Sequence, residues 1–242
     1  MIRCIACTVF ALVGLVGCNF SQSPVTCVIG QGGGGGGWFA KYTLKPSQPG
    51  GACSRKAGEG LGVRKYFPDG QKPLVVIRTD TLGAMALATP SDTDPTHSPN
   101  SSGNLTQDAP DANDICAIPT LTRAEQNAGG SDIAYEWSDV KFVVRANVPG
   151  TQMSATLRYT EGGCTAEYKA VGMQPNADCF QVDSTGAPVL DGMGNQIPDD
   201  SRCGPGSFPQ TNVNPDFAVR CDPVLFKCVL TSDPPALKPG VQ

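Results

Sequence analysis

The sequence has little of the chemistry on which many enzymes depend: it contains one histidine, two tryptophans and 17% charged residues in a chain of 242. Histidine is the side chain most often used as a general acid or base, and a nucleophile usually needs a base beside it. His97, the single histidine, lies among Pro, Asp, Ser and Thr residues that are typical of an exposed loop. We therefore predict that the protein is not an enzyme, and no cofactor is indicated.

Three further absences exclude other classes of protein. The net charge of −4 argues against nucleic acid as the main partner. The chain after Cys18 has no Cys-x-x-Cys pair, and His97 is far in sequence from every cysteine, so no zinc site is predicted. No apolar run reaches the roughly 20 residues that a transmembrane helix requires.

The first 17 residues have the pattern of a secretory signal peptide. Arg3 supplies one positive charge, and an apolar run follows from Ile5 to Val16. This run is too short to cross a bilayer, but it matches the apolar region of a signal peptide that ends in small residues. We therefore expect residues 1–17 to be removed on export.

The end of this segment, Leu15-Val16-Gly17-Cys18, resembles the bacterial lipobox. The resemblance implies cleavage before Cys18, a diacylglycerol on its sulfur and acylation of its new amino group. Several acyl chains on one residue make a durable anchor, because a single chain binds only reversibly. Asn19, in place of an Asp, indicates the outer membrane. Two alternatives remain open, an ordinary signal peptide with Cys18 in a disulfide and an uncleaved anchor.

The number of cysteines supports the lipobox interpretation. Eleven is odd, but Cys4 and Cys7 leave with the signal peptide and Cys18 carries lipid. An even remainder in an exported protein fits a framework of four disulfides. The short loop between Cys221 and Cys228 makes them the first candidate pair, followed by Cys179 with Cys203 and Cys27 with Cys53. The eight candidates are Cys27, Cys53, Cys116, Cys164, Cys179, Cys203, Cys221 and Cys228.

Composition divides the mature chain into a tether, a folded domain and a tail. Residues 18–37 are polar and end in glycines, which predicts a flexible tether. Residues 38–233 form the predicted single β domain, interrupted near 89–114 by a polar stretch that we expect to be a long exposed loop. Residues 234–242 are a Pro-rich tail.

Alternation of apolar and polar residues predicts antiparallel strands. The pattern is clear over 38–44, 61–67, 74–77 and 133–148, and clearest over 155–160 and 166–170, which turn residues separate. Residues 82–88 fit either a strand or a helix, 175–216 are loop-like, and 217–230 contain one or two short strands. The predicted fold class is an all-β antiparallel sandwich or small barrel, stapled by disulfides and with long irregular loops.

Scattered motifs in this domain are similar to those of Cys-rich exported lipoproteins of myxobacterial type, which have no assigned activity. The resemblance implies a lipid-anchored domain outside the cytoplasm and adds no catalytic residue. The motifs are Tyr135-x-Trp137-Ser-x-Val140, Gly150-Thr-Gln, Gly163-Cys-Thr-Ala-Glu-Tyr168, Asn214-Pro-Asp-Phe217 and Cys221-Asp-Pro with Cys228.

One segment has the spacing of a calcium loop, in which oxygen ligands recur at every second residue. Met193 stands where an oxygen ligand is needed and Gln196 replaces a glycine, so a turn cluster without metal is the preferred interpretation. The alternative calcium ligands are Asp191, Asn195, Asp199 and Asp200.

The sequence therefore predicts an exported envelope lipoprotein whose partner is a membrane, with a non-catalytic domain that has a structural or recognition role. Its protein or glycan ligand is left open. Two other classes remain as alternatives. A hydrolase of cell-wall or polysaccharide substrate needs only two carboxylates, for which Glu125, Glu136, Glu161 and Glu167 are available. A small-ligand carrier requires an apolar pocket inside a barrel.

Overall fold

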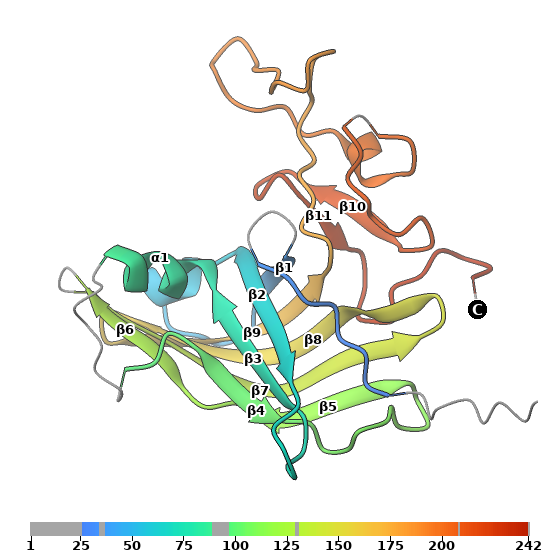
Figure 1. Ribbon diagram of the computed structural model, residues 1–242. Coiled ribbons are helices and arrows are strands. Elements are labelled where there is room, and N and C mark those ends of the chain that lie inside the picture. The colour runs from blue at the N-terminus through green and yellow to red at the C-terminus, as the bar shows by residue number, and fades with distance from the viewer. Residues whose placement is uncertain (1–25, 34–36, 89–96, 129–130, 208, 242) are drawn as a thin grey trace, which may run out of the picture.

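The computed structural model describes residues 26–33, 37–88, 97–128, 131–207 and 209–241. Its main feature is an antiparallel sheet that curls into a nearly closed barrel, so the predicted all-β class is confirmed (Figure 1). The strand order is β4-β3-β2-β1-β9-β8-β7-β5, and β6 pairs with β7. The strands are β1 (Trp38–Leu44), β2 (Gly58–Tyr66), β3 (Leu74–Thr79), β4 (Ser101–Asn104), β5 (Ile115–Thr120), β6 (Ala124–Ala128), β7 (Ser131–Arg145), β8 (Val148–Glu161) and β9 (Cys164–Met173).

The two ends of this sheet meet close to β4 and β5. The Thr106 amide donates to the Ala117 carbonyl at 2.9 Å, and the Thr122 amide donates to the Ser102 carbonyl at 2.8 Å. Gly103 permits the approach, because a Cβ at this position would lie 2.6 Å from the Thr120 carbonyl oxygen. The closing strand lies within the predicted 89–114 loop, so that prediction is wrong for residues 101–104.

Aromatic side chains fill the interior of the barrel. Trp38 packs edge-to-face on Phe142 at 5.6 Å, and Tyr135 lies between Trp137 at 6.4 Å and Tyr159 at 5.1 Å. All five rings are at most 2% exposed. A core filled in this way does not favour the small-ligand carrier, which needs internal space.

Helix α1 (Asp80–Ala88) resolves the ambiguous 82–88 segment and packs at one end of the barrel (Figure 1). Its Leu82 is fully buried, while Leu87 is 83% exposed. The Leu82 amide donates to the Thr79 hydroxyl at 3.2 Å, which satisfies one of the unpaired N–H groups of the first turn. The chain thus leaves β3 as a short helix that covers one end of the barrel.

The residues after β9 form a smaller C-terminal module that stands on the barrel (Figure 1). It contains the hairpin of β10 (Val219–Asp222) and β11 (Lys227–Leu230) and a short 3-10 turn, Asp200–Cys203. A second apolar core joins the module to β7, β8 and β9. Its fully or mostly buried members are Val143, Val148, Met173, Ala177, Cys179, Cys203, Val213, Phe217, Cys228, Leu230 and Ala236.

Buried polar contacts fix the module to the barrel. Gln152 of β8 is fully buried; its amide donates to the Ala236 carbonyl at 3.1 Å and accepts from the Ala236 amide at 2.8 Å. The predicted 234–242 tail is therefore partly structured, because Ala236 is buried and Leu237 forms a bridge with Phe217.

The ion pair between Lys41 of β1 and Asp222 of β10 joins the same two parts at 2.7 Å. Burial alone would raise the Asp222 pKa, but the Lys41 hydrogen bond and the amides of Val224 and Leu225 outweigh burial and hold this pKa below its usual value.

This contact predicts that the protein loses stability in acid. Because the pKa of Asp222 is lower in the folded state, its carboxylate stabilises the fold above the unfolded value of about 4, and the contribution is lost as the pH falls through the folded pKa. Asp222→Asn should lower the unfolding free energy at pH 7 by about 1.5 to 3 kcal/mol and flatten its fall below pH 4. Urea unfolding between pH 7 and pH 2 measures both changes. Asp233→Asn is the matched control, since Asp233 pairs with Lys169 but is 61% exposed. Equal pH profiles of wild type and Asp222→Asn would contradict the assignment.

Candidate functional site

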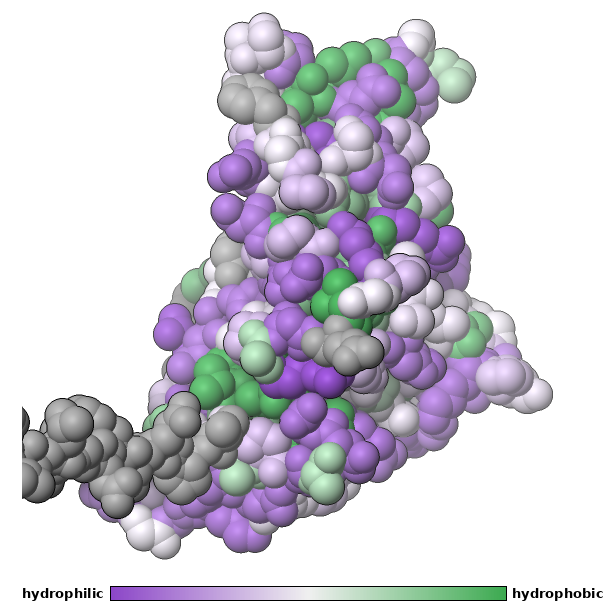
Figure 2. Space-filling model, turned by 90° about the vertical axis from the view of Figure 1, so that its right-hand side faces the viewer, coloured by the Kyte–Doolittle hydropathy of each residue, from purple (hydrophilic) through white to green (hydrophobic). Residues whose placement is uncertain are grey.

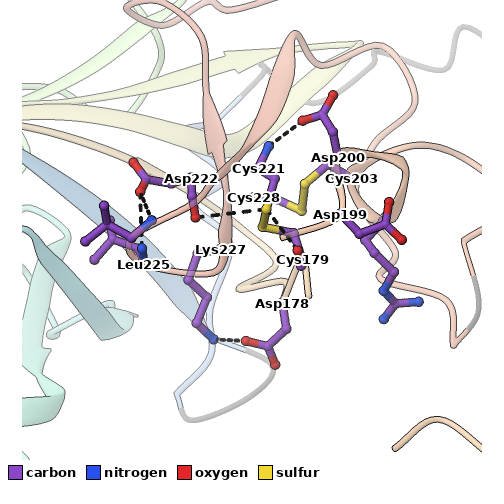
Figure 3. Close-up of a disulfide and its surroundings, with 12 residues drawn as sticks. Asp178, Cys179, Asp199, Asp200, Cys203, Cys221, Asp222, Leu225, Lys227 and Cys228 are labelled. Atoms are coloured by element: carbon purple, nitrogen blue, oxygen red, sulfur yellow. Dashed lines mark hydrogen bonds and ion pairs between the residues drawn. A yellow bond between two sulfur atoms is a disulfide. The ribbon is translucent and has the colours of Figure 1, made fainter. Parts of the chain in front are cut away.

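All eight predicted cysteines form disulfides, in pairs that bring distant parts of the chain together. Cys27 bonds Cys116 and Cys53 bonds Cys164, across separations of 89 and 111 residues. In the module, Cys179 bonds Cys221 and Cys203 bonds Cys228 (Figure 3). The four-bridge framework is thus confirmed, whereas the three predicted pairs are wrong.

The error at Cys221 and Cys228 has a physical reason. The two residues lie opposite each other in the β10–β11 ladder, but hydrogen bonds of the hairpin already close the short loop between them. A bond between them would add little restraint, since a disulfide stabilises more when it closes a longer loop. Each instead ties the hairpin to a segment that lacks a strand of its own, at Cys179 and at Cys203.

The two bridges of the module lie against each other. The sulfurs of Cys179, Cys203 and Cys228 are all within 4.8 Å of one another. Metal binding needs thiolates, and here every sulfur is bonded to a second sulfur, so the cluster has no zinc ligand while it is oxidised.

The Cys27 bridge changes the predicted boundary of the tether. Cys27 and Ile29 are buried, the Cys27 amide donates to the Asp108 carbonyl at 2.8 Å, and Gly32 pairs with Val63 of β2. Residues 26–33 are therefore part of the folded domain, and the prediction of a tether over 18–37 is wrong for them. Cys18 and the predicted signal peptide lie outside the described residues.

The chain between Cys179 and Asp199 forms an arm that extends away from the barrel (Figure 1). Two turns with the same construction shape it. The Asp183 carboxylate accepts from the amides of Thr185 and Ala187, and the Asp191 carboxylate accepts from those of Met193 and Asn195. The Thr185 hydroxyl, which also donates to Asp183, and the amide hydrogen bonds lower the pKa of Asp183, and the Asn195 and Met193 amides lower that of Asp191. The glycine three residues after each aspartate, Gly186 or Gly194, has a φ of about +85°, which glycine adopts without strain.

The calcium alternative is not supported by this geometry. Asp191 is occupied by the turn, the Asp199 carboxylate accepts from the Ser201 amide at 3.0 Å, and the Asp200 carboxylate accepts from the Cys221 amide at 2.6 Å. Within the described ranges, no set of three clustered carboxylates is found. The amide of Asn195 donates to Asp191, so it acts as a turn residue.

The end of the barrel contains a buried carboxylate, Glu59, which the sequence analysis missed. Its Oε1 accepts from Tyr135 at 2.7 Å and lies 3.2 Å from Lys56 Nζ, and its Oε2 accepts from the Thr81 amide at 3.0 Å. A second tyrosine, Tyr42, donates at 3.3 Å. Burial first, and Glu59 second, raise the pKa of both tyrosines, which keeps them protonated as donors.

Two members of this cluster, Lys56 and Thr81, also line a surface pocket of about 360 Å³ together with Arg55, Tyr159 and Glu161. The sequence contained a usable signal, since Glu59 has the same parity as the buried Leu61 and Val63 in β2. A charged residue at an inward position of a strand indicates a buried polar partner.

The four glutamates considered for hydrolysis are all engaged by neighbouring side chains. Arg123 pairs with Glu125 at 2.6 Å and with Glu136 at 2.8 Å, and Arg158 also pairs with Glu136. The carboxylate of Glu161 accepts from Tyr159, and that of Glu167 lies 3.4 Å from Lys45. His97 lies 3.9 Å from Glu125 beside a polar surface pocket of about 360 Å³. Each of these four carboxylates therefore has a cationic or hydroxyl partner.

No helix in the described part of the chain has the length and apolar composition needed to cross a membrane.

These features define a class: a disulfide-stabilised antiparallel β-barrel domain of the type found in exported proteins, with an extended C-terminal arm. A family model described as MlpA matches residues 36–175. The chain is also 30% identical to "Putative lipoprotein MlpA" of Myxococcus xanthus, over 98% of this chain and 100% of that protein. The chain belongs to the MlpA family, which confirms the predicted resemblance to myxobacterial lipoproteins. No solved structure matches it significantly.

Proposed function

We propose that this protein is an exported lipoprotein of the outer membrane, anchored by lipid on Cys18 after removal of residues 1–17. The main support is that all eight later cysteines are used in four disulfides, so none of them is left to form a disulfide with Cys18. A disulfide from Cys18 into the domain is thereby disfavoured, and the lipobox-like sequence Leu15 to Cys18 supplies a chemical role for its sulfur.

We infer that the domain has a structural or recognition role and does not catalyse a reaction. The barrel interior is filled by rings, and the glutamates available for hydrolysis are held in ion pairs or hydrogen bonds. The arm offers a surface for recognition, because Leu190 and Met193 are 53% and 85% exposed and apolar surface gathers at the top of Figure 2. Its protein or glycan ligand is open.

Metabolic labelling with a clickable palmitate tests the anchor. The wild-type protein should carry the label and fractionate with the outer membrane on a sucrose gradient, because its acyl chains insert into that bilayer. Cys18→Ser should abolish the label, whereas Cys7→Ser, inside the predicted signal peptide, should retain it. Label on the Cys18→Ser protein would refute the assignment of Cys18.

A further inference from the structure

We propose that the tip of the β2–β3 hairpin docks on the bilayer, with Phe67 and Tyr66 in the headgroup region of the membrane that holds the Cys18 lipid. The inference rests on the proposed function. It adds a second contact with the membrane and a fixed orientation of the domain.

The hairpin tip presents two aromatic rings to solvent. Phe67 is 69% exposed and Tyr66 is 51% exposed, at the point where β2 turns toward β3. Val28, next to Cys27 in the segment that precedes the barrel, is 54% exposed. Exposed aromatic side chains at one tip are typical of a surface that another phase or partner covers.

Contacts with the neighbouring loop hold this tip in place. The Lys72 ammonium donates to the Thr106 carbonyl at 2.8 Å, and the Asn104 amide donates to the Lys72 carbonyl at 2.9 Å. Within the turn, the Gln71 amide donates to the Pro68 carbonyl at 3.1 Å. The rings are thus presented by a braced hairpin, which reduces the conformational entropy lost on docking.

The tip lies beside the point where the chain from Cys18 enters the domain. The Lys65 ammonium donates to the Cys27 carbonyl and lies 4.6 Å from the centroid of the Phe67 ring. The segment around Cys27 is held in place, since the Lys65 amide donates to the Gln31 side chain and Cys27 is bonded to Cys116. One side chain therefore connects the entry point and the exposed ring.

The length of chain between the anchor and this point places a bilayer within reach of the tip. Cys27 follows Cys18 by nine positions, so the lipid can lie at most about 32 Å away, and a random-coil chain of this length would span about 17 Å on average. The domain surface nearest to Cys27 is thus the surface that meets the membrane most often.

The side chains around the rings suit a lipid surface. Arg64 and Lys72 are exposed cations beside the tip, and Asp69 and Asp108 are exposed anions. Mixed charges do not select a strongly charged partner. Aromatic rings flanked by basic side chains are the pattern found at membrane interfaces, where rings sit at headgroup depth and the cations reach the phosphates.

The opposite end of the protein provides an internal comparison. In Figure 1 the hairpin tip lies at the bottom and the arm at the top, so docking of Phe67 turns the arm away from the bilayer. Met193, at 85% exposure on the arm, is an apolar residue that should remain in water.

Tryptophan fluorescence of the full lipidated protein in phosphatidylcholine vesicles with brominated acyl chains tests the docking. The native Trp38 and Trp137 are at most 2% exposed and give a constant background. Bromine near the headgroup should remove most of the added emission of Phe67→Trp and leave that of the matched control Met193→Trp unchanged. Tyr66→Trp is a second variant, in case the first does not fold.

Palmitate labelling of the same samples separates the two proposals. Emission of a labelled Phe67→Trp protein that is unaffected by bromine would overturn the docking and leave the anchor intact. Equal quenching of Phe67→Trp and Met193→Trp would also overturn it, because the orientation would then be absent. Samples without palmitate would overturn the proposed function and the docking together.

Discussion

Replacement of Glu59 by alanine is expected to lower the free energy of unfolding by about 3 to 5 kcal/mol, the usual cost when one partner of a buried ion pair is removed. Glu59 is only 8% exposed and binds two tyrosine hydroxyls, one backbone amide and the Lys56 ammonium. Alanine would leave all four groups without this acceptor inside the barrel. Unsatisfied buried donors are strongly unfavourable, and Lys56 would lose its counter-charge and keep its hydrogen bond to the Thr81 hydroxyl.

Urea unfolding of the purified protein in detergent measures this effect. Glu167→Ala is the matched control, since it also removes a glutamate from a lysine pair, but its side chain is 46% exposed and the expected loss is under about 1 kcal/mol. Tyr135→Phe removes one donor alone and should cost about 1 kcal/mol. Equal losses for Glu59→Ala and Glu167→Ala would show that Glu59 is not a structural centre.

The Glu59 cluster also shows where prediction from the sequence ends. Alternation predicted β1 and the β8–β9 pair well, because one face of each lies in the barrel core and much of the other face carries polar residues. In β2 the same rule predicted a strand that begins at Leu61, two residues after Glu59, so it left Glu59 out. Three of the partners of Glu59 come from β1, β7 and α1, and no local pattern specifies which strands a barrel brings together.

Closure of the barrel was unpredictable for a related reason. β4 has the sequence Ser101-Ser-Gly-Asn104, without an apolar residue, so its composition indicates a loop. It forms a strand because β3 lies on one side and Gly103 fits closely beside Thr120 on the other. Here tertiary contacts override the local preference.

Of all these features, disulfide connectivity depends most strongly on the tertiary fold. Removal of a bridge is also the second change for which we expect a large loss of stability. Cys53→Ser/Cys164→Ser should lower the unfolding free energy by about 4 to 5 kcal/mol, because the bridge closes a loop with a sequence separation of 111. The Cys203–Cys228 bridge closes a loop with a sequence separation of only 25, so Cys203→Ser/Cys228→Ser should lower the unfolding free energy by about 3.5 kcal/mol. The order of the two losses tests loop length as the cause.

Peptide mapping without reductant tests the pairing itself. Digestion should release linked peptides that contain Cys27 with Cys116, Cys53 with Cys164, Cys179 with Cys221 and Cys203 with Cys228. A peptide that joins Cys221 to Cys228 would contradict the arrangement of the module. This outcome is a demanding test, since these two cysteines face each other across the β10–β11 hairpin and each is bonded instead to a cysteine that flanks the arm, Cys179 or Cys203. If the pairing holds, loss of the Cys179–Cys221 bridge should loosen the arm while the barrel, whose two bridges lie elsewhere, keeps its fold.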